Sequence, residues 1–176
     1  MNISMRETVK TINEAISNAL KGCKLSIRGI AEIVPISPNG KAPALVENSG
    51  ECQTDLFDDK YDVGIYHRVF SNGYSTANAG GVGDYPKATR QTNMSIVVCG
   101  KRKIHDQFDL ENLLASILLR NNCKPTETSF DRNEVFSSEF AGVEFFIKPD
   151  YFLFRIKYSI NKPMQLSPAS IGATST

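Results

Sequence analysis

The chain contains no long apolar run, and this absence sets the first limit on its function. None of its 176 residues belongs to a stretch approaching the roughly eighteen consecutive apolar residues that a membrane-spanning helix needs. Residues 1–10 also lack the continuous apolar core of a secretory signal peptide. We therefore expect an intracellular protein without a membrane partner.

An excess of charge of one sign is also missing. The formal net charge is +1, whereas a protein built mainly to coat nucleic acid would carry a strong basic excess. A hydrophobic fraction of 41% and a charged fraction of 22% are those of an ordinary folded domain. We expect a single domain over residues 1–160 and a flexible tail over residues 161–176, which are rich in Pro, Ser, Ala and Thr.

Groups that catalyse reactions or bind metals are scarce. Four widely spaced cysteines form no Cys-x-x-Cys pair, and the two histidines, His67 and His105, show no ligand or triad spacing. The glycine cluster at residues 80–83 leads into a strand, not into the helix N-terminus that a phosphate loop requires. These patterns predict no catalytic residue, no cofactor and no metal. An unrecognised hydrolase built around the histidines and the acidic residues 55–62 stays an alternative.

Apolar periodicity predicts the fold class. Two segments, residues 3–20 and 109–121, carry apolar side chains at helical spacing, and Asp109 is placed to cap the second. Alternation and turn residues predict strands at residues 24–34, 44–46, 62–70 and 92–99, and a final hairpin pairing 140–148 with 151–160. Residues 126–133 are predicted to be a polar connector. The expected fold is α+β, a mostly antiparallel sheet with two helices packed on one face.

The last predicted strand has the most regular alternation in the chain. Its aromatic and aliphatic residues share one face, while Arg155, Lys157 and Ser159 share the other. We expect the first face to lie in the core and the second to meet water or a polar partner.

Residues 71–91 form an insert with no helix or strand pattern between two predicted strands. Connections in compact domains usually take about four to six residues, so a loop of roughly twenty is expected to be an arm that a partner orders. Residues expected to take part in interactions lie in this loop, after the following strand and in the acidic connector: Tyr74, Tyr85, Lys87, Arg90, Lys101, Arg102, Lys103, Asp55, Asp58 and Asp59.

Charge in this region is open to two interpretations. No acidic residue occurs from Lys87 through Ile104, so the loop and the corner at residues 101–103 would form a positive surface if they faced one side. Such a surface would touch nucleic acid without reading its sequence. The alternative is a solvated strand end. Residues 55–62 are acidic and would complement a basic stretch on a neighbouring copy.

The order of the predicted elements is itself distinctive. It comprises an amphipathic helix at residues 5–20, an extended segment at 43–46, a long hairpin with a large loop at 61–99, a helix with an acidic start at 109–114, and an alternating aromatic run at 151–158. This order resembles that of the tail-terminator and neck-protein family of tailed bacteriophages. The resemblance covers most of residues 3–160 and includes no invariant motif.

The resemblance implies a small α+β subunit of the virion, made in the host cytoplasm, that forms a closed ring around the DNA channel in the neck or at the tail end. Its implied partners are copies of itself, adjacent neck, portal or tail proteins, and DNA contacted without sequence specificity. A non-viral bacterial adaptor or binding module that uses the same loops is the alternative.

Overall fold

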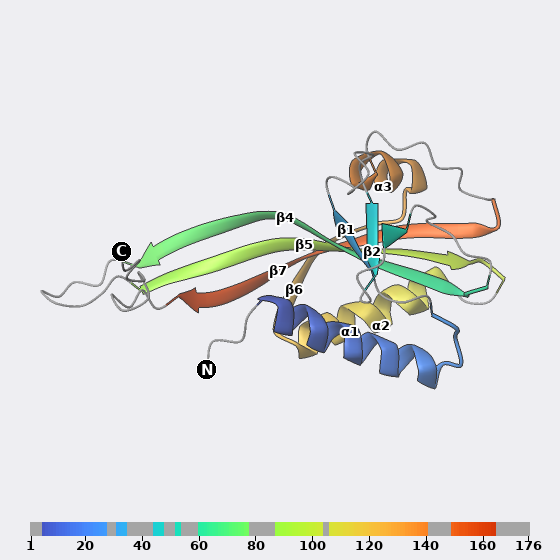
Figure 1. The fold of residues 1–176 in the computed structure, drawn as a ribbon, viewed down its shortest axis with the longest axis horizontal. Helices are drawn as coiled ribbons and strands as arrows, with labels where there is room; N and C mark the ends of the chain where they lie inside the picture. The colour runs from blue at the N-terminus through green and yellow to red at the C-terminus, as the bar shows by residue number, and fades with distance from the viewer. Residues whose placement is uncertain are drawn as a thin grey trace, which may run out of the picture.

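The computed structural model of the protein describes residues 5–27, 31–34, 44–47, 52–53, 60–77, 87–103, 106–140 and 149–164. Within these ranges the chain forms one seven-stranded sheet and three helices (Figure 1). Every pairing between the strands is antiparallel except one. The predicted α+β fold with a mostly antiparallel sheet is therefore confirmed.

Two amphipathic helices cover one face of the sheet, as predicted (Figure 1). Helix α1 spans Met5–Gly22 and helix α2 spans Gln107–Arg120. The N-cap of α2 is Asp106, whose carboxylate accepts a hydrogen bond of 2.7 Å from the Phe108 backbone N–H. The predicted cap, Asp109, lies in the first turn instead. The buried stripes of the two helices consist of Ile12, Ile16, Leu20, Leu110, Leu114, Ile117 and Leu118.

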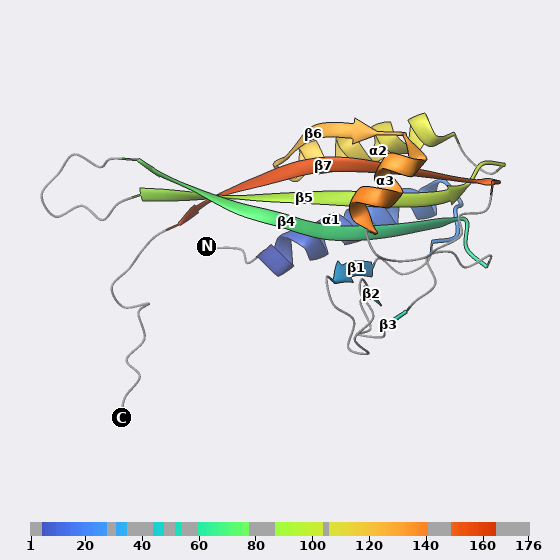
Figure 2. The same cartoon turned by 90° about the horizontal axis from the view of Figure 1, so that it is seen from above.

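A third helix, α3 (Arg132–Glu139), lies on the opposite face of the sheet (Figures 1 and 2). Asp131 caps it by accepting hydrogen bonds from the backbone N–H groups of Asn133 and Glu134. The prediction of a polar connector over residues 126–133 is thus wrong. The segment is polar because it contains an exposed edge strand and a short helix that is fixed by charged groups.

The strands follow the order β3-β2-β1-β4-β5-β7-β6 across the sheet. The last strand of the chain, β7, lies between β5 and β6; it pairs with β5 along its whole length and with β6 over residues 155–160. Phe140, where the predicted hairpin began, is the C-cap of α3, and residues 141–148 lie outside the described residues. The strands are β1 (Ala31–Val34), β2 (Ala44–Glu47), β3 (Cys52–Gln53), β4 (Val63–Ala77), β5 (Lys87–Lys101), β6 (Cys123–Ser129) and β7 (Tyr151–Met164).

The predicted long loop is shorter than the sequence suggested. Residues 71–77 continue β4 and residues 87–91 begin β5, so only residues 78–86 of that insert lie outside the described residues. The two strands pair continuously from Val63 and Gly100 to Ala77 and Lys87, apart from one irregularity. The sequence did not indicate this extension, because backbone pairing needs no alternation of apolar residues. Similarly, residues 161–164 of the predicted tail belong to β7, and residues 165–176 lie outside the described residues.

The main core lies between the sheet and helices α1 and α2. Side chains from β4, β5 and β7 that face these helices are buried, and Phe152 and Phe154 pack with their ring centroids 5.9 Å apart. A smaller apolar cluster on the other face joins Val135 and Phe140 to Val97 and Leu153. Among the helices formed by the described residues, none has both the length and the apolar character needed to cross a membrane.

Candidate assembly interface

The most distinctive part of the structure is a three-stranded extension of the sheet, which we call the arm. It consists of residues 71–77 of β4, 87–93 of β5 and 161–164 of β7. In two perpendicular views these strands run past the ends of the helices that cover the rest of the sheet (Figures 1 and 2). The arm therefore leaves the body as a bare sheet.

Both faces of the arm are open along strand β4. Consecutive residues 71–75 are all exposed although their side chains alternate between the faces, and Tyr74 retains 63% of its accessible surface. The exposed side chains of Thr89 and Gln91 continue this surface on β5. A stable sheet normally buries at least one face against another layer, so the arm lacks the usual apolar support.

Polar side chains hold the arm together across its strands. On one face Asn72 accepts hydrogen bonds from Thr92 Oγ1 at 2.8 Å and from Arg90 Nε at 3.2 Å. On the other face Asn93 donates to Ser71 Oγ at 3.0 Å and accepts from Gln91 Nε2 at 3.1 Å. These contacts fix the register but bury little apolar area.

A β-bulge marks the base of the arm. Val69 pairs with Met94, whereas Ser71 pairs with Asn93, so Phe70 is the additional residue in β4. Because a bulge shifts the alternation by one position, Asn72 and Tyr74 follow the helix-facing side beyond it. Further along the arm, Lys162 of β7 lies in the row of Tyr74 and Arg90 and hydrogen-bonds Thr8 of α1, which ties the arm to the body.

Two of the predicted interaction residues, Tyr74 and Arg90, lie opposite each other on the arm. Lys87 is the first residue of β5, and Tyr85 lies outside the described residues. The remaining basic residues, Lys101, Arg102 and Lys103, are at the other end of β5. A strand of 15 residues places its ends roughly 48 Å apart at about 3.4 Å per residue. These residues therefore do not form the single positive surface that one of the two interpretations required.

The main residues of the predicted acidic surface, Asp55, Asp58 and Asp59, lie outside the described residues. Asp62, the last of that stretch, is engaged within the chain. Hydrogen bonds from the backbone N–H and hydroxyl of Ser26, at 2.9 and 2.7 Å, lower the pKa of Asp62, and Lys101 Nζ lies 3.7 Å away. The charges of Asp62 and Lys101 thus pair with each other within the chain.

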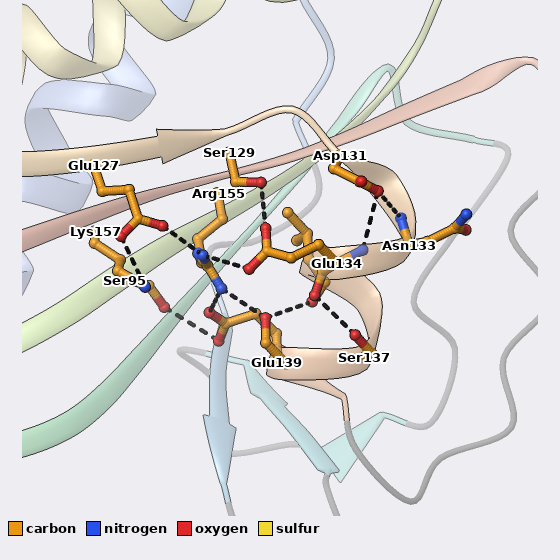
Figure 3. Close-up of polar contacts among 12 residues, drawn as sticks. Ser95, Glu127, Ser129, Asp131, Asn133, Glu134, Ser137, Glu139, Arg155 and Lys157 are labelled. Atoms are coloured by element: carbon orange, nitrogen blue, oxygen red, sulfur yellow. Dashed lines mark hydrogen bonds and ion pairs between the residues drawn. The ribbon is translucent and has the colours of Figure 1, made fainter.

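A second polar feature, which we call the Arg155 cluster, joins α3 to the sheet (Figure 3). Arg155 is only 1% exposed, and its guanidinium contacts carboxylates from three positions: Glu134 at 2.8 Å, Glu127 at 3.0 Å and Glu139 at 3.4 Å. The face of β7 that carries Arg155 therefore meets a polar partner, as predicted, but the partner belongs to the same chain.

Glu139 is the most buried carboxylate of this cluster, at 1% exposure. Burial raises its pKa, while the guanidinium groups of Arg68 and Arg155 and the hydroxyl of Ser95 act in the opposite direction. Arg68 lies 3.5 Å from Glu139 and also donates to the backbone carbonyl of Ser138 at 2.9 Å. The cluster is a structural connection between α3 and the sheet.

Sequence reasoning missed the Arg155 cluster as a site. One signal was available, because Asp131 and Glu134 have the spacing of a residue that caps a helix and an acidic residue in its first turn. That signal predicts α3, but it does not identify the strand onto which the helix packs.

His67 lies in the main core beneath the helices. Its Nδ1 is 3.4 Å from the Tyr158 hydroxyl, and burial lowers the pKa of its ring to about 4. The side chain is therefore neutral at physiological pH and is not presented to solvent. His105 lies outside the described residues.

Across the described part of the chain, no three His, Cys, Asp or Glu side chains are grouped so that they could hold a metal ion. Comparison with known proteins found no protein-family model that matches the chain and no matching curated protein.

Proposed function

We propose that this chain is a structural subunit of a tailed-bacteriophage virion, one that forms a closed ring in the neck or at the tail terminus. Neighbouring copies and adjoining neck, portal or tail proteins are its partners. The observation that carries the proposal is the arm, which projects past the helices and leaves residues 71–75 of β4 exposed on both faces.

The energetics of the arm support a role in assembly. Three strands without an apolar face gain little from their own burial, while ordering the backbone costs about 1–2 kcal/mol per residue. Neighbouring subunits that cover the arm would supply the missing buried area. A part that is marginal in one copy and stable between copies suits a protein that acts by assembling.

A ring requires two different complementary surfaces on every subunit. The arm and the helix-covered body offer two different surfaces, at opposite ends of the long strands (Figure 2). The element order behind the phage resemblance is also present: helix α1, the long β4–β5 hairpin, helix α2 and the aromatic strand β7.

The test is the assembly state of the purified chain, measured by mass photometry and negative-stain microscopy. Closed rings of uniform size are expected at high concentration or on addition of neck partners. A chain that stays monomeric under both conditions overturns the proposal.

A shortened arm identifies the surface responsible. Gly73 and Gln91 are register partners, so a two-residue Asn-Gly turn can replace residues 74–90 without altering the body. Circular dichroism should show a folded protein, and rings should be lost. The control is Lys21→Ala, which changes an exposed residue in the last turn of α1, away from the arm, and should leave the rings intact.

A further inference from the structure

The outer edge of β4 in the arm is unusual among the strand edges of this sheet. On the outer side of β4, strand β1 pairs with Tyr66 and His67 alone. In the part of the chain that the structure describes, no strand therefore lies on that side of residues 71–77. This segment, Ser-Asn-Gly-Tyr-Ser-Thr-Ala, contains no charge and no proline. Proteins usually protect free strand edges with charged residues or proline, because an unprotected edge is a template for another strand.

The other described edges do carry protection. Strand β6 has Lys124, Pro125 and Glu127. Strand β7 extends beyond β6 at both ends: residues 161–164 include Lys162 and Pro163, and the side chains of residues 151–154 are buried. Strand β3 is only two residues long. Among the described residues, the arm edge of β4 is therefore the exposed edge that lacks such protection, and two copies that pair by strand addition must both use it.

We propose that two copies of the free protein pair through this β4 edge, antiparallel and about a two-fold axis. Such a contact uses the same surface on both copies and closes at two. It is therefore distinct from the head-to-tail contacts of a ring, and it does not depend on the proposed function.

The length of the edge specifies the register. The bulge at Phe70 ends the regular segment on one side and the strand ends at Ala77 on the other. The midpoint of residues 71–77 is Tyr74, so full overlap places Tyr74 opposite Tyr74 of the second copy. An exposed tyrosine then gains a cross-strand aromatic partner, which stabilises antiparallel pairs.

Site-directed crosslinking tests this register. In a chain with Cys23 and Cys52 replaced by serine, Tyr74→Cys should form a covalent dimer with a short thiol-reactive crosslinker, because opposite Cβ atoms lie about 5 Å apart. Ser71→Cys is the matched control on the same edge. In this register the two Ser71 positions are separated by six residues, roughly 20 Å, and should not crosslink.

Sedimentation velocity provides the second measurement. Tyr74→Lys places two like charges opposite each other and should weaken the dimer at least tenfold, whereas Tyr74→Phe should preserve it. Circular dichroism checks that both variants fold. The proposal is overturned if Tyr74→Cys does not crosslink, if Ser71→Cys crosslinks equally well, or if Tyr74→Lys dimerises like the wild type. Rings without β4 pairs would contradict this inference alone, and pairs without rings would contradict the proposed function alone.

Discussion

Replacing Arg155 with methionine removes the central cation of the Arg155 cluster and keeps most of the side-chain volume. Glu127 and Glu134 are half exposed, so water solvates them after the change. The consequence is different for Glu139, which is fully buried and loses a guanidinium 3.4 Å away.

The size of the effect follows from this difference. Breaking a buried ion pair by removing one partner costs about 3–5 kcal/mol. Arg68 stays within 3.5 Å of Glu139, which favours the lower end, about 3 kcal/mol. At about 2–4 °C per kcal/mol for a domain of this size, the thermal midpoint should fall by roughly 6–12 °C.

Urea unfolding monitored by circular dichroism measures the free energy directly. The double variant Arg155→Met with Glu139→Gln should recover at least half of the loss, because no buried charge is then left with a missing partner. Lys157→Met is the control, since its partner Glu127 is half exposed and such pairs contribute about 1 kcal/mol or less. A loss below about 1 kcal/mol for Arg155→Met, or no recovery in the double variant, would refute the reasoning.

Three further predictions concern the core and the strand ends. Because the folded-state pKa of His67 is lowered to about 4, protonation of its ring favours the unfolded chain. The free energy of unfolding should therefore fall by roughly 3 kcal/mol between pH 6.5 and 4. In parallel urea titrations, His67→Gln should remove that part of the pH dependence. Gly100→Ala forces a Cβ against the Phe152 ring, closer than two carbon atoms can approach, and should cost about 1–3 kcal/mol in urea. Gly73→Ala should avoid that clash, because the nearest atom to its Cβ is the Gln91 carbonyl oxygen, 4.0 Å away. The lowered pKa of Asp62 means that its stabilising contribution persists above the ordinary carboxyl pKa and is lost as pH falls through the folded-state value; an NMR titration showing an unshifted or raised Asp62 pKa would contradict this.

The parts of the fold that the sequence predicts are those where burial follows a regular period. Ile12, Ile16 and Leu20 recur at four-residue steps and lie buried on α1. The alternation of β7 likewise places Phe152 and Phe154 in the core. In these segments, one-sided burial leaves a pattern that can be read locally.

The sequence of the arm has no such regular pattern of buried residues. Residues 71–75 are exposed on both faces, so the period-two signal that identifies a strand is missing there. Their pairing depends on β5, and on cross-strand contacts such as Asn72 with Thr92, 20 residues later in the chain. Tyr74 and Arg90 were predicted as interaction residues from their position in an unexplained insert, and the structure places them on the arm.

The Arg155 cluster was hidden for a related reason. Alternation assigned Arg155 to the polar face of its strand, but its burial depends on carboxylates 16 to 28 residues earlier in the chain. Which glutamates reach it is decided by the placement of β6 and α3, and a local pattern does not encode that placement.

The position of β7 between β5 and β6 has a consequence for synthesis on the ribosome. Strands β4 and β5 emerge first, but the slot beside β5 stays empty until a segment about sixty residues further along the chain has been translated. At about 5–20 residues per second, that delay lasts roughly 3–12 s. During this interval β5 presents apolar residues and an unfilled edge to the cytosol, so a nascent-chain chaperone would bind most productively before β7 arrives.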